Sequence, residues 1–230
     1  MPETADALTI PSRHADFPDW HRGRRRYAVW AIDVDGPAAR AAVARLQEHL
    51  GDFLLPGYRR QPHVTLHLCG FPGTIGQLAD DYTAAQFSCH LQALAAARLP
   101  PFAIAVGGPD TFTSAAFLAI ADGDGGIAHV RRALGGGGAA AGDAPYVPHL
   151  TVGLYRAALP VARVRQLLAA LPNPQPFIFE VTRLTLMTYE AAAIAGPLAR
   201  IGEFDLVEQR WRTLAAGACK PLSGESANGL

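Results

Sequence analysis

The sequence has no excess of charge of either sign. Over 230 residues, 20 Lys and Arg residues are balanced by 20 Asp and Glu residues, so the formal net charge is zero. Proteins that hold long stretches of DNA or RNA usually carry a basic surplus that neutralises the phosphates. The composition therefore argues against an extended nucleic-acid partner, and any phosphate chemistry is expected on a small nucleotide or a strand end.

Cysteines are few, and a long apolar stretch is absent. The three cysteines, Cys69, Cys89 and Cys219, form no C-x-x-C pair, so neither a disulfide framework nor a zinc site is predicted. No window approaches about 18 consecutive apolar residues, and the acidic, proline-containing N-terminus lacks the apolar run of a signal peptide. We therefore expect a soluble, cytoplasmic, monomeric protein that does not contact a membrane.

The pattern of apolar residues is that of a globular domain, and it repeats. Strand, helix, strand, helix and strand are predicted in that order twice. The first set comprises 24–36, 37–51, 63–70, 75–99 and 101–108; the second comprises 114–122, 125–134, 146–155, 160–172 and 176–190, followed by a strand at 197–206. This order predicts an α+β fold, a bilobal, pseudo-two-fold duplication of strand-helix-strand units with two antiparallel sheets facing a central cleft.

One domain is expected to occupy most of the chain. Residues 1–24 are polar and without a period, and we expect them to form an N-terminal arm. Residues 25–213 are predicted to be a single bilobal domain, with lobes at about 25–108 and 109–213 that exchange a strand. Residues 214–230 are expected to be a flexible tail.

One short motif occurs at matching places in the two halves. The stretches PHVTLHLCG and PHLTVGLYR begin at Pro62 and Pro148, so their histidines lie 86 positions apart (149 − 63). Alternate residues of a strand point to the same face. In the first copy the predicted shared face carries His63, Thr65 and His67, and the core face carries Val64, Leu66 and Leu68. In the second copy the corresponding sets are His149, Thr151, Gly153 and Tyr155, and Leu150, Val152 and Leu154.

This repetition favours a chemical role. A single H-x-T on a strand is usually a surface pair, but two pairs related by a two-fold would enclose one site with two imidazoles and two hydroxyls. One neutral His can take a proton from water while the other, protonated, gives a proton to a leaving oxygen. The Thr hydroxyls can donate hydrogen bonds to phosphoryl oxygens. The residues therefore predict phosphoester chemistry by acid–base catalysis, with no cofactor.

No metal site is predicted. His63 and His67 have the four-residue spacing of a helical metal-binding pair. On a strand, however, they would lie about 13 Å apart, too far to share an ion. His67 is expected at the rim of the site or in solvent.

The sequence resembles the 2H phosphoesterase superfamily, which includes bacterial 2'-5' RNA ligase-like proteins and cyclic nucleotide phosphodiesterases. The resemblance covers roughly residues 25–207, and the stretches YAVWAIDVDG, PHVTL, PYVPHLTVGLY and FEVTRLTLMT are most similar to the plant-type cyclic phosphodiesterase branch. It implies a bilobal α+β fold with the two motifs on facing strands. It also implies that His63 and His149 are the general acid and base and that Thr65 and Thr151 hold the phosphate.

The same resemblance implies further substrate-binding residues. Trp30 matches an aromatic residue of the first strand that lines the cleft in the plant-type branch, and Tyr155 matches a tyrosine shortly after the second motif. RNA ligase-like members often carry an arginine three residues beyond the second Thr, where this sequence has Leu154. Arg60 or Arg156 is expected to replace it.

The activity that the resemblance implies is metal-independent hydrolysis of a 2',3'-cyclic phosphate, on a nucleotide or an RNA 3' end, to a phosphomonoester. In the plant-type branch the product is a 2'-phosphate. One alternative is reversible 2'-5' RNA ligation or cleavage with the same residues. Another is a protein that binds nucleotides or RNA ends without turnover. The sequence leaves open which histidine is the acid and which is the base.

Overall fold

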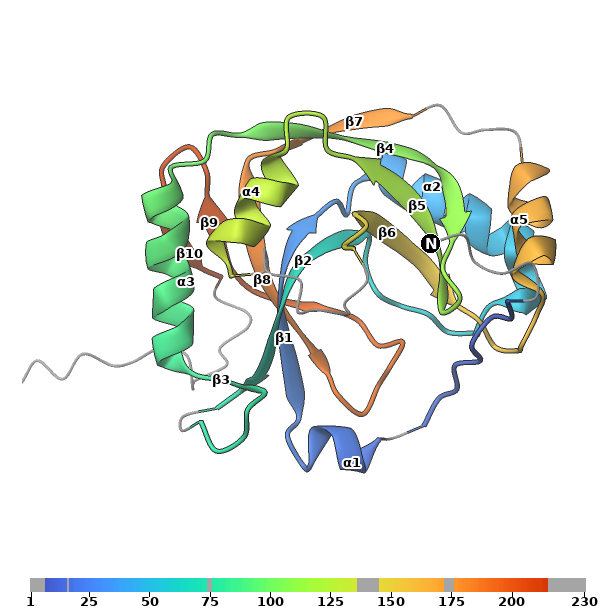
Figure 1. Cartoon of the computed structure of the whole chain (residues 1–230), viewed down its shortest axis with the longest axis horizontal. Helices are drawn as coiled ribbons and strands as arrows, with labels where there is room; N and C mark the ends of the chain where they lie inside the picture. The colour runs from blue at the N-terminus through green and yellow to red at the C-terminus, as the bar shows by residue number, and fades with distance from the viewer. Residues whose placement is uncertain (1–6, 16, 74–75, 136–144, 172–175, 215–230) are drawn as a thin grey trace, which may run out of the picture.

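The computed structural model describes residues 7–15, 17–73, 76–135, 145–171 and 176–214, and its described part is built on two curled sheets (Figure 1). The larger sheet has the order β10-β9-β8-β1-β2-β3 and the smaller one the order β6-β5-β4-β7. The strands of the larger sheet are β1 (Arg26–Asp33), β2 (His63–Pro72), β3 (Asp81–Tyr82), β8 (Arg183–Glu190), β9 (Ala199–Asp205) and β10 (Arg210–Thr213). Those of the smaller sheet are β4 (Phe102–Thr111), β5 (Ala115–Ala121), β6 (His149–Leu154) and β7 (Phe177–Val181). Only the β2–β3 pair is parallel among the described strands, and the predicted α+β class is confirmed.

Helices lie at two ends of this arrangement, α3 and α4 at one and α2 and α5 at the other (Figure 1). The helical segments are α1 (Pro18–His21), α2 (Pro37–Leu50), a short 3-10 turn (Gly51–Phe53), α3 (Ala84–Ala97), α4 (Gly126–Ala133) and α5 (Val161–Ala169). In α2, Pro37 occupies the first turn and Gly51 ends the helix with a φ of 43°, as expected for a helix start and stop. No helix in the described part of the chain is long and apolar enough to cross a membrane.

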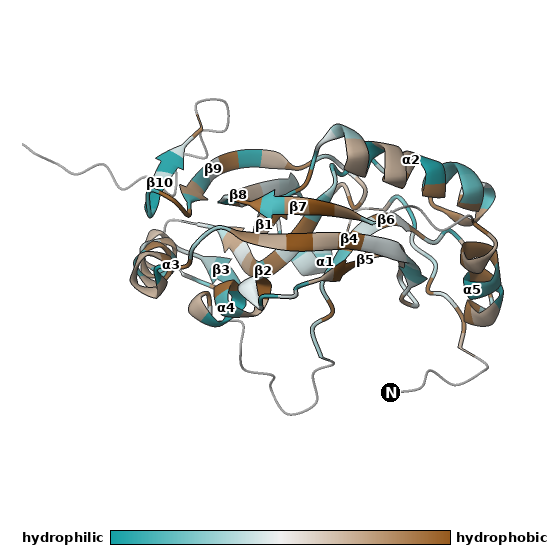
Figure 2. Cartoon of the chain, turned by 90° about the horizontal axis from the view of Figure 1, so that it is seen from above, coloured by the Kyte–Doolittle hydropathy of each residue, from teal (hydrophilic) through white to brown (hydrophobic). Residues whose placement is uncertain are grey.

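The core lies between the sheets and under these helices. Side chains from both sheets and from α2 to α5 form one buried cluster, among them Leu46, Leu66, Leu118 and Val164. Figure 2 shows an apolar stretch in β4, inside the smaller sheet, and a polar β10 at the edge of the larger sheet. The packing therefore joins both halves of the chain in a single core.

The helix predicted from residue 75 begins only at Ala84. The Thr83 hydroxyl accepts a hydrogen bond from the backbone N–H of Gln86, and the Gln86 side-chain oxygen accepts one from the backbone N–H of Thr83 at 2.8 Å. This reciprocal capping box fixes the helix start. Asp81 and Tyr82, which precede Thr83, pair with the end of β2 and form the short strand β3.

The single strand predicted for 176–190 is two strands, interrupted at Thr182. The first, β7, pairs with β4 in the smaller sheet, whereas β8 pairs with β1 in the larger sheet. Both predicted lobes, 25–108 and 109–213, contribute strands to both sheets: β4 of the first lies in the smaller sheet, and β8 to β10 of the second lie in the larger one. Almost all of the predicted tail, residues 215–230, lies outside the described residues.

The predicted arm is partly fixed to the domain. Leu8 forms a β-bridge with Pro160, and the backbone N–H of Thr9 donates to the carbonyl of Leu159 at 2.8 Å. Further along, Arg24 pairs with Asp80 and Asp81 at 2.6 and 2.7 Å. The described part of this segment therefore contacts the domain at two separate places.

The duplication extends to the register of the strands that carry the two motifs. In β1–β2 the cross-strand partners are Asp33↔His63 and Ala31↔Thr65, and in β5–β6 they are Ala119↔His149 and Phe117↔Thr151. Each residue of the second set lies 86 positions after its counterpart. In both ladders the register shifts just beyond the Thr, so that one extra residue, Leu66 or Val152, is inserted as a β-bulge.

Candidate active site

The two histidine motifs meet where β2 and β6 adjoin, near the middle of the molecule (Figure 1). His63 and His149 are the first residues of these two strands. The two imidazoles are close enough for charge on His149 to lower the pKa of His63. Thr65 and Thr151 follow two positions later and share the faces of their histidines, because no bulge intervenes.

Both imidazoles are oriented in the same way by the backbone. The Nδ1 atom of His63 lies 2.7 Å from the carbonyl oxygen of Gln61, and that of His149 lies 2.8 Å from the carbonyl oxygen of Val147. A carbonyl only accepts hydrogen bonds, so each Nδ1 must be the donor. In the neutral ring the proton is then on Nδ1, and Nε2 is the nitrogen that can accept a proton.

The two histidines differ in burial. His63 is only 7% exposed, and burial lowers its pKa to about 4, with smaller effects in the same direction from the charges of Arg60 and His149. His149 is partly exposed, and burial lowers its pKa as well. The hydrogen bonds to the Gln61 and Val147 carbonyls act in the opposite direction on the two rings. At neutral pH His63 is therefore neutral, with Nε2 ready to accept a proton.

This burial should make the protein sensitive to acid. Because the pKa of His63 is about 4 in the folded protein and near 6.5 when exposed, the unfolded chain binds the extra proton first as the pH falls. The free energy of unfolding should then decrease between pH 6.5 and 4, by about 3 kcal/mol for this residue. Urea unfolding at several pH values should show a shallower decrease for His63→Asn than for the wild type.

The matched control is His129→Asn, which removes an exposed imidazole from α4. His90, whose pKa burial also lowers to about 4, contributes equally to all three proteins. A His63→Asn variant that is as acid-sensitive as the wild type would contradict the burial effect.

Arg60 lies beside this pair as a cation without an acidic partner among the described residues. Its guanidinium carbon lies 4.1 Å above the centre of the Tyr189 ring, and its charge reaches both His63 and Tyr58. The Nε atom is buried and has no hydrogen-bond partner in the described part of the chain. Such a group is suited to an incoming anion. Arg156, in contrast, forms an ion pair with Asp52 at 3.6 Å.

Two residues that the sequence suggested for substrate binding lie in the core. Trp30 is fully buried; its Nε1 donates to His90 Nδ1 at 3.2 Å, and its ring packs against Phe87 and Trp211. Tyr155 is also fully buried, with its hydroxyl 2.5 Å from that of Thr111. Neither side chain is accessible to a substrate, and both predictions are corrected.

The β-bulges explain most of these differences. An extra residue in a strand reverses the faces of all residues after it. The bulge at Val152 therefore turns Tyr155 into the core, and the bulge at Leu66 turns His67 toward His90, with ring centres 5.1 Å apart. The same shift leaves Leu68, predicted in the core, 62% exposed. Trp30 is paired with His67 and faces away from Thr65.

Three aromatic residues that sequence reasoning missed contact the site. Tyr58 forms a side-chain hydrogen bond with Thr151, and the Tyr146 hydroxyl donates to the carbonyl of Thr65 at 2.7 Å. Tyr58 lies five residues before His63 and Tyr146 three residues before His149, and each tyrosine contacts the motif of the other copy. A tyrosine shortly before each motif was a usable signal. The third is Phe112, at the turn between β4 and β5, whose ring centre lies 4.9 Å from that of His149 in an edge-to-face arrangement. No pattern in the sequence pointed to it.

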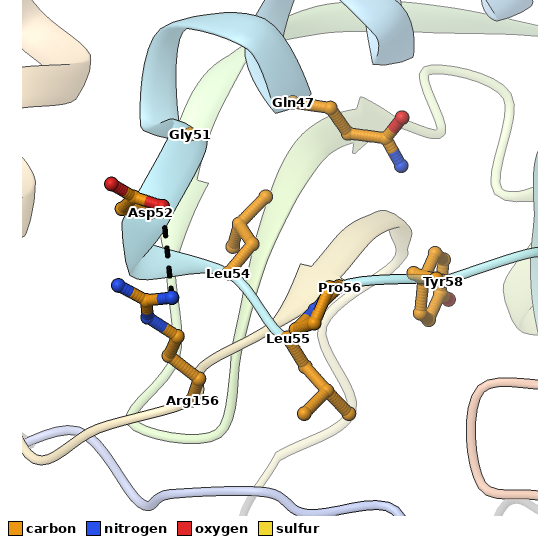
Figure 3. A pocket seen from close by; sticks show the side chains of 9 residues that line it. Gln47, Gly51, Asp52, Leu54, Leu55, Pro56, Tyr58 and Arg156 are labelled. Carbon is orange, nitrogen blue, oxygen red and sulfur yellow. Dashed lines mark ion pairs between the residues drawn. The ribbon is translucent and has the colours of Figure 1, made fainter.

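A cavity of about 220 Å³ lies beside the site, between the 3-10 turn with its following loop and Arg156, two residues after β6 (Figure 3). Neither histidine lines it. Tyr58 is in its lining and also contacts Thr151, and the Asp52–Arg156 ion pair borders it on another side. Among the described residues no group of three or more His, Cys, Asp or Glu side chains could hold a metal ion.

Comparison with known proteins identifies one matching family model and solved structures of a similar fold. A family model described as the 2'-5' RNA ligase superfamily matches residues 34–193. The structure of Escherichia coli LigT complexed with 3'-AMP is 17% identical, covers 79% of this chain and 98% of its own, and has a TM-score of 0.53. The TT0787 protein of Thermus thermophilus is 17% identical, covers 78% of this chain and 97% of its own, and also has a TM-score of 0.53. No curated protein matches the chain.

At these identities the solved structures show the fold alone, and they agree with the two-sheet architecture described above. The family model covers well over half of the sequence. The chain therefore belongs to the 2'-5' RNA ligase superfamily of 2H phosphoesterases.

Proposed function

We propose that this protein is a metal-independent phosphodiesterase that opens 2',3'-cyclic phosphates of nucleotides or RNA 3' ends. The observation that supports this most directly is the meeting of two His-x-Thr pairs in which each imidazole donates from Nδ1 to a backbone carbonyl. Both Nε2 atoms are then available for proton transfer at one place. Two such groups suit a reaction in which one oxygen loses a proton and another gains one.

In this proposal His63 is the general base and His149 the general acid. His63 Nε2 removes a proton from water as its oxygen attacks phosphorus. The bond from phosphorus to the 2' or 3' oxygen breaks, and that oxygen receives a proton from His149 Nε2. The products are a phosphomonoester, a protonated His63 and a neutral His149, and exchange with solvent restores the starting state. The deeper burial of His63 favours this assignment, because burial keeps its ring neutral.

Negative charge on the phosphoryl oxygens needs hydrogen-bond donors and a cation. The hydroxyls of Thr65 and Thr151 share the faces of the two histidines. Arg60 adds a guanidinium, without an acidic partner among the described residues, on the His63 side. We expect a bound phosphate to contact all three groups, since fixed donors and charges that face developing negative charge stabilise a transition state. A bound phosphate also favours the protonated form of His149.

The nucleoside has a candidate contact on the His149 side. Phe112 is partly exposed and lies beside His149, stacked on Phe117 with ring centres 4.2 Å apart. An aromatic ring held in this way can stack on a nucleobase of any identity. The complex of Escherichia coli LigT with 3'-AMP supports a nucleoside phosphate as the class of ligand.

Turnover assays with the purified protein test this proposal. Incubation with 2',3'-cyclic AMP, GMP, CMP or UMP should give nucleoside monophosphates, which phosphorus NMR separates into 2' and 3' isomers. Activity should be unchanged after treatment with EDTA, because the proposed steps use only side chains. Activity on oligonucleotide ends but not on mononucleotides would favour the ligase-type reaction that the family description suggests. Tight product binding without turnover would favour a binding protein and would refute the proposal.

A further inference from the structure

The side chain of Gln61 is bound at both ends to the backbone of one distant residue. Its Oε1 accepts from the N–H of Leu198 at 2.8 Å, and its Nε2 donates to the carbonyl of Leu198 at 3.1 Å. Because a backbone N–H only donates, the orientation of the amide is fixed by its partners. The amide thus pairs with residue 198 as a neighbouring strand would.

Leu198 provides a firm attachment. It is 6% exposed and packs with Val29, Ala31 and Met187 in a small apolar cluster on the larger sheet. Ala31 is the cross-strand partner of Thr65, so this cluster lies on the face that carries the first motif. The segment before His63 is therefore fastened to the sheet on which the motif itself lies.

The backbone of Gln61 continues this chain of contacts to the catalytic candidate. Its carbonyl is the group that accepts the hydrogen bond from His63 Nδ1 at 2.7 Å. Leu198 holds the Gln61 side chain, and the Gln61 carbonyl holds the imidazole. The position of that carbonyl decides both the tautomer and the direction of Nε2.

The second motif has no equivalent of this attachment. Val147 occupies the position 86 residues after Gln61 and offers its carbonyl to His149 in the same way. Its side chain is apolar and 44% exposed, so it can make no hydrogen bond. The fold therefore forms a His-x-Thr pair without such an amide, and the amide at Gln61 is specific to the His63 side.

We propose that Gln61 is a positioning residue, which holds His63 in the Nδ1–H tautomer with Nε2 directed at the attacking water. This inference rests on the proposed function for its catalytic consequence, but the tautomer itself does not depend on the reaction. Misplacement of a reacting group by about 1 Å can cost on the order of 10²-fold in rate. Loss of the amide should thus lower kcat and leave KM nearly unchanged, since both ends of the Gln61 amide are engaged by the backbone of Leu198.

The test replaces Gln61 by Met, which has a similar length and no amide. For Gln61→Met we expect kcat for a 2',3'-cyclic nucleotide to fall on the order of 10- to 100-fold, with KM within about threefold. Nitrogen-15 NMR of the His63 ring should change from a single Nδ1–H tautomer to a mixture, whereas the His149 ring should not change. Gln61→Glu keeps an acceptor for the Leu198 N–H and should retain more of kcat than Gln61→Met. It also provides a second variant should Gln61→Met fail to fold.

The matched control is Gln209→Met, at the turn between β9 and β10. Gln209 also donates to backbone carbonyls, those of Leu99 and Leu206 at 2.8 and 2.5 Å, and neither of these partners belongs to a motif. Its kcat and both imidazole spectra should equal those of the wild type. The inference is wrong if Gln61→Met keeps kcat within twofold or keeps His63 in one Nδ1–H tautomer. Absence of turnover in the wild type would refute the proposed function, whereas the NMR comparison would still decide the role of Gln61.

Discussion

His63→Ala should lower kcat for 2',3'-cyclic nucleotides by about 10²- to 10⁴-fold, the usual contribution of a general base. In the wild type, burial keeps this ring neutral at pH 7 and the Gln61 carbonyl keeps the proton on Nδ1. The variant leaves the attacking water without an acceptor for its proton. Initial rates at saturating substrate measure the effect. The loss should be equally large for a substrate with an activated leaving group, because water must still be deprotonated.

Two control measurements distinguish the loss of a catalytic group from unfolding of the variant. The far-ultraviolet circular dichroism spectrum and the thermal unfolding curve of His63→Ala should show that the variant is folded at the assay temperature. His129→Ala, which removes an exposed imidazole on α4, should retain full activity. A folded His63→Ala protein with undiminished turnover would contradict the role of His63 in either direction of proton transfer.

His149→Ala should show a similar loss with cyclic nucleotides but a much smaller one with an aryl phosphodiester. A ribose oxygen leaves as a strongly basic alkoxide and needs a proton, whereas a nitrophenolate leaves without one. We therefore expect about a 10²- to 10⁴-fold decrease for 2',3'-cyclic nucleotides and a decrease of less than about tenfold for a p-nitrophenyl phosphodiester. Comparison of kcat for the two substrates gives the result directly.

The same pair of substrates tests the assignment of roles. If His149 were the base, its variant would lose activity on both substrates, and His63→Ala would be the variant that the aryl ester rescues. Both variants failing equally on both substrates would show that each histidine is needed for binding or for structure, and the acid–base assignment would be refuted.

The difference between the two histidines is notable because their motifs are so alike. Both copies share the Pro-His-x-Thr pattern, the register of the His and Thr, the bulge after the Thr, and a backbone carbonyl two residues before the His as the Nδ1 partner. What differs is the surroundings: His63 is more deeply buried and lies near Arg60, whereas His149 is partly exposed and lies beside Phe112. Environment separates the pKa values of chemically identical groups in many acid–base pairs. Here the duplication provides two histidines in equivalent positions, and their different burial gives the two imidazoles different chemical properties.

The sequence by itself determined the features that depend on short-range rules. A His and a Thr two residues apart lie on one face of a strand, so each pair was readable from its own few residues. The order of strands and helices followed from apolar periods, from Pro37 at a helix start and from Gly51 at its end. The family also follows from the motifs, and the match over residues 34–193 confirms it.

The tertiary structure decided the rest, because those features depend on partners far away in the chain. A bulge exists only relative to the neighbouring strand, and the bulges at Leu66 and Val152 turned His67 and Tyr155 away from their predicted face. Burial is a property of the whole core: it placed Trp30 under α3 and not against a substrate, and it set the low pKa of His63. The amide of Gln61 gained a role only because the fold brings Leu198 to it, 137 residues away.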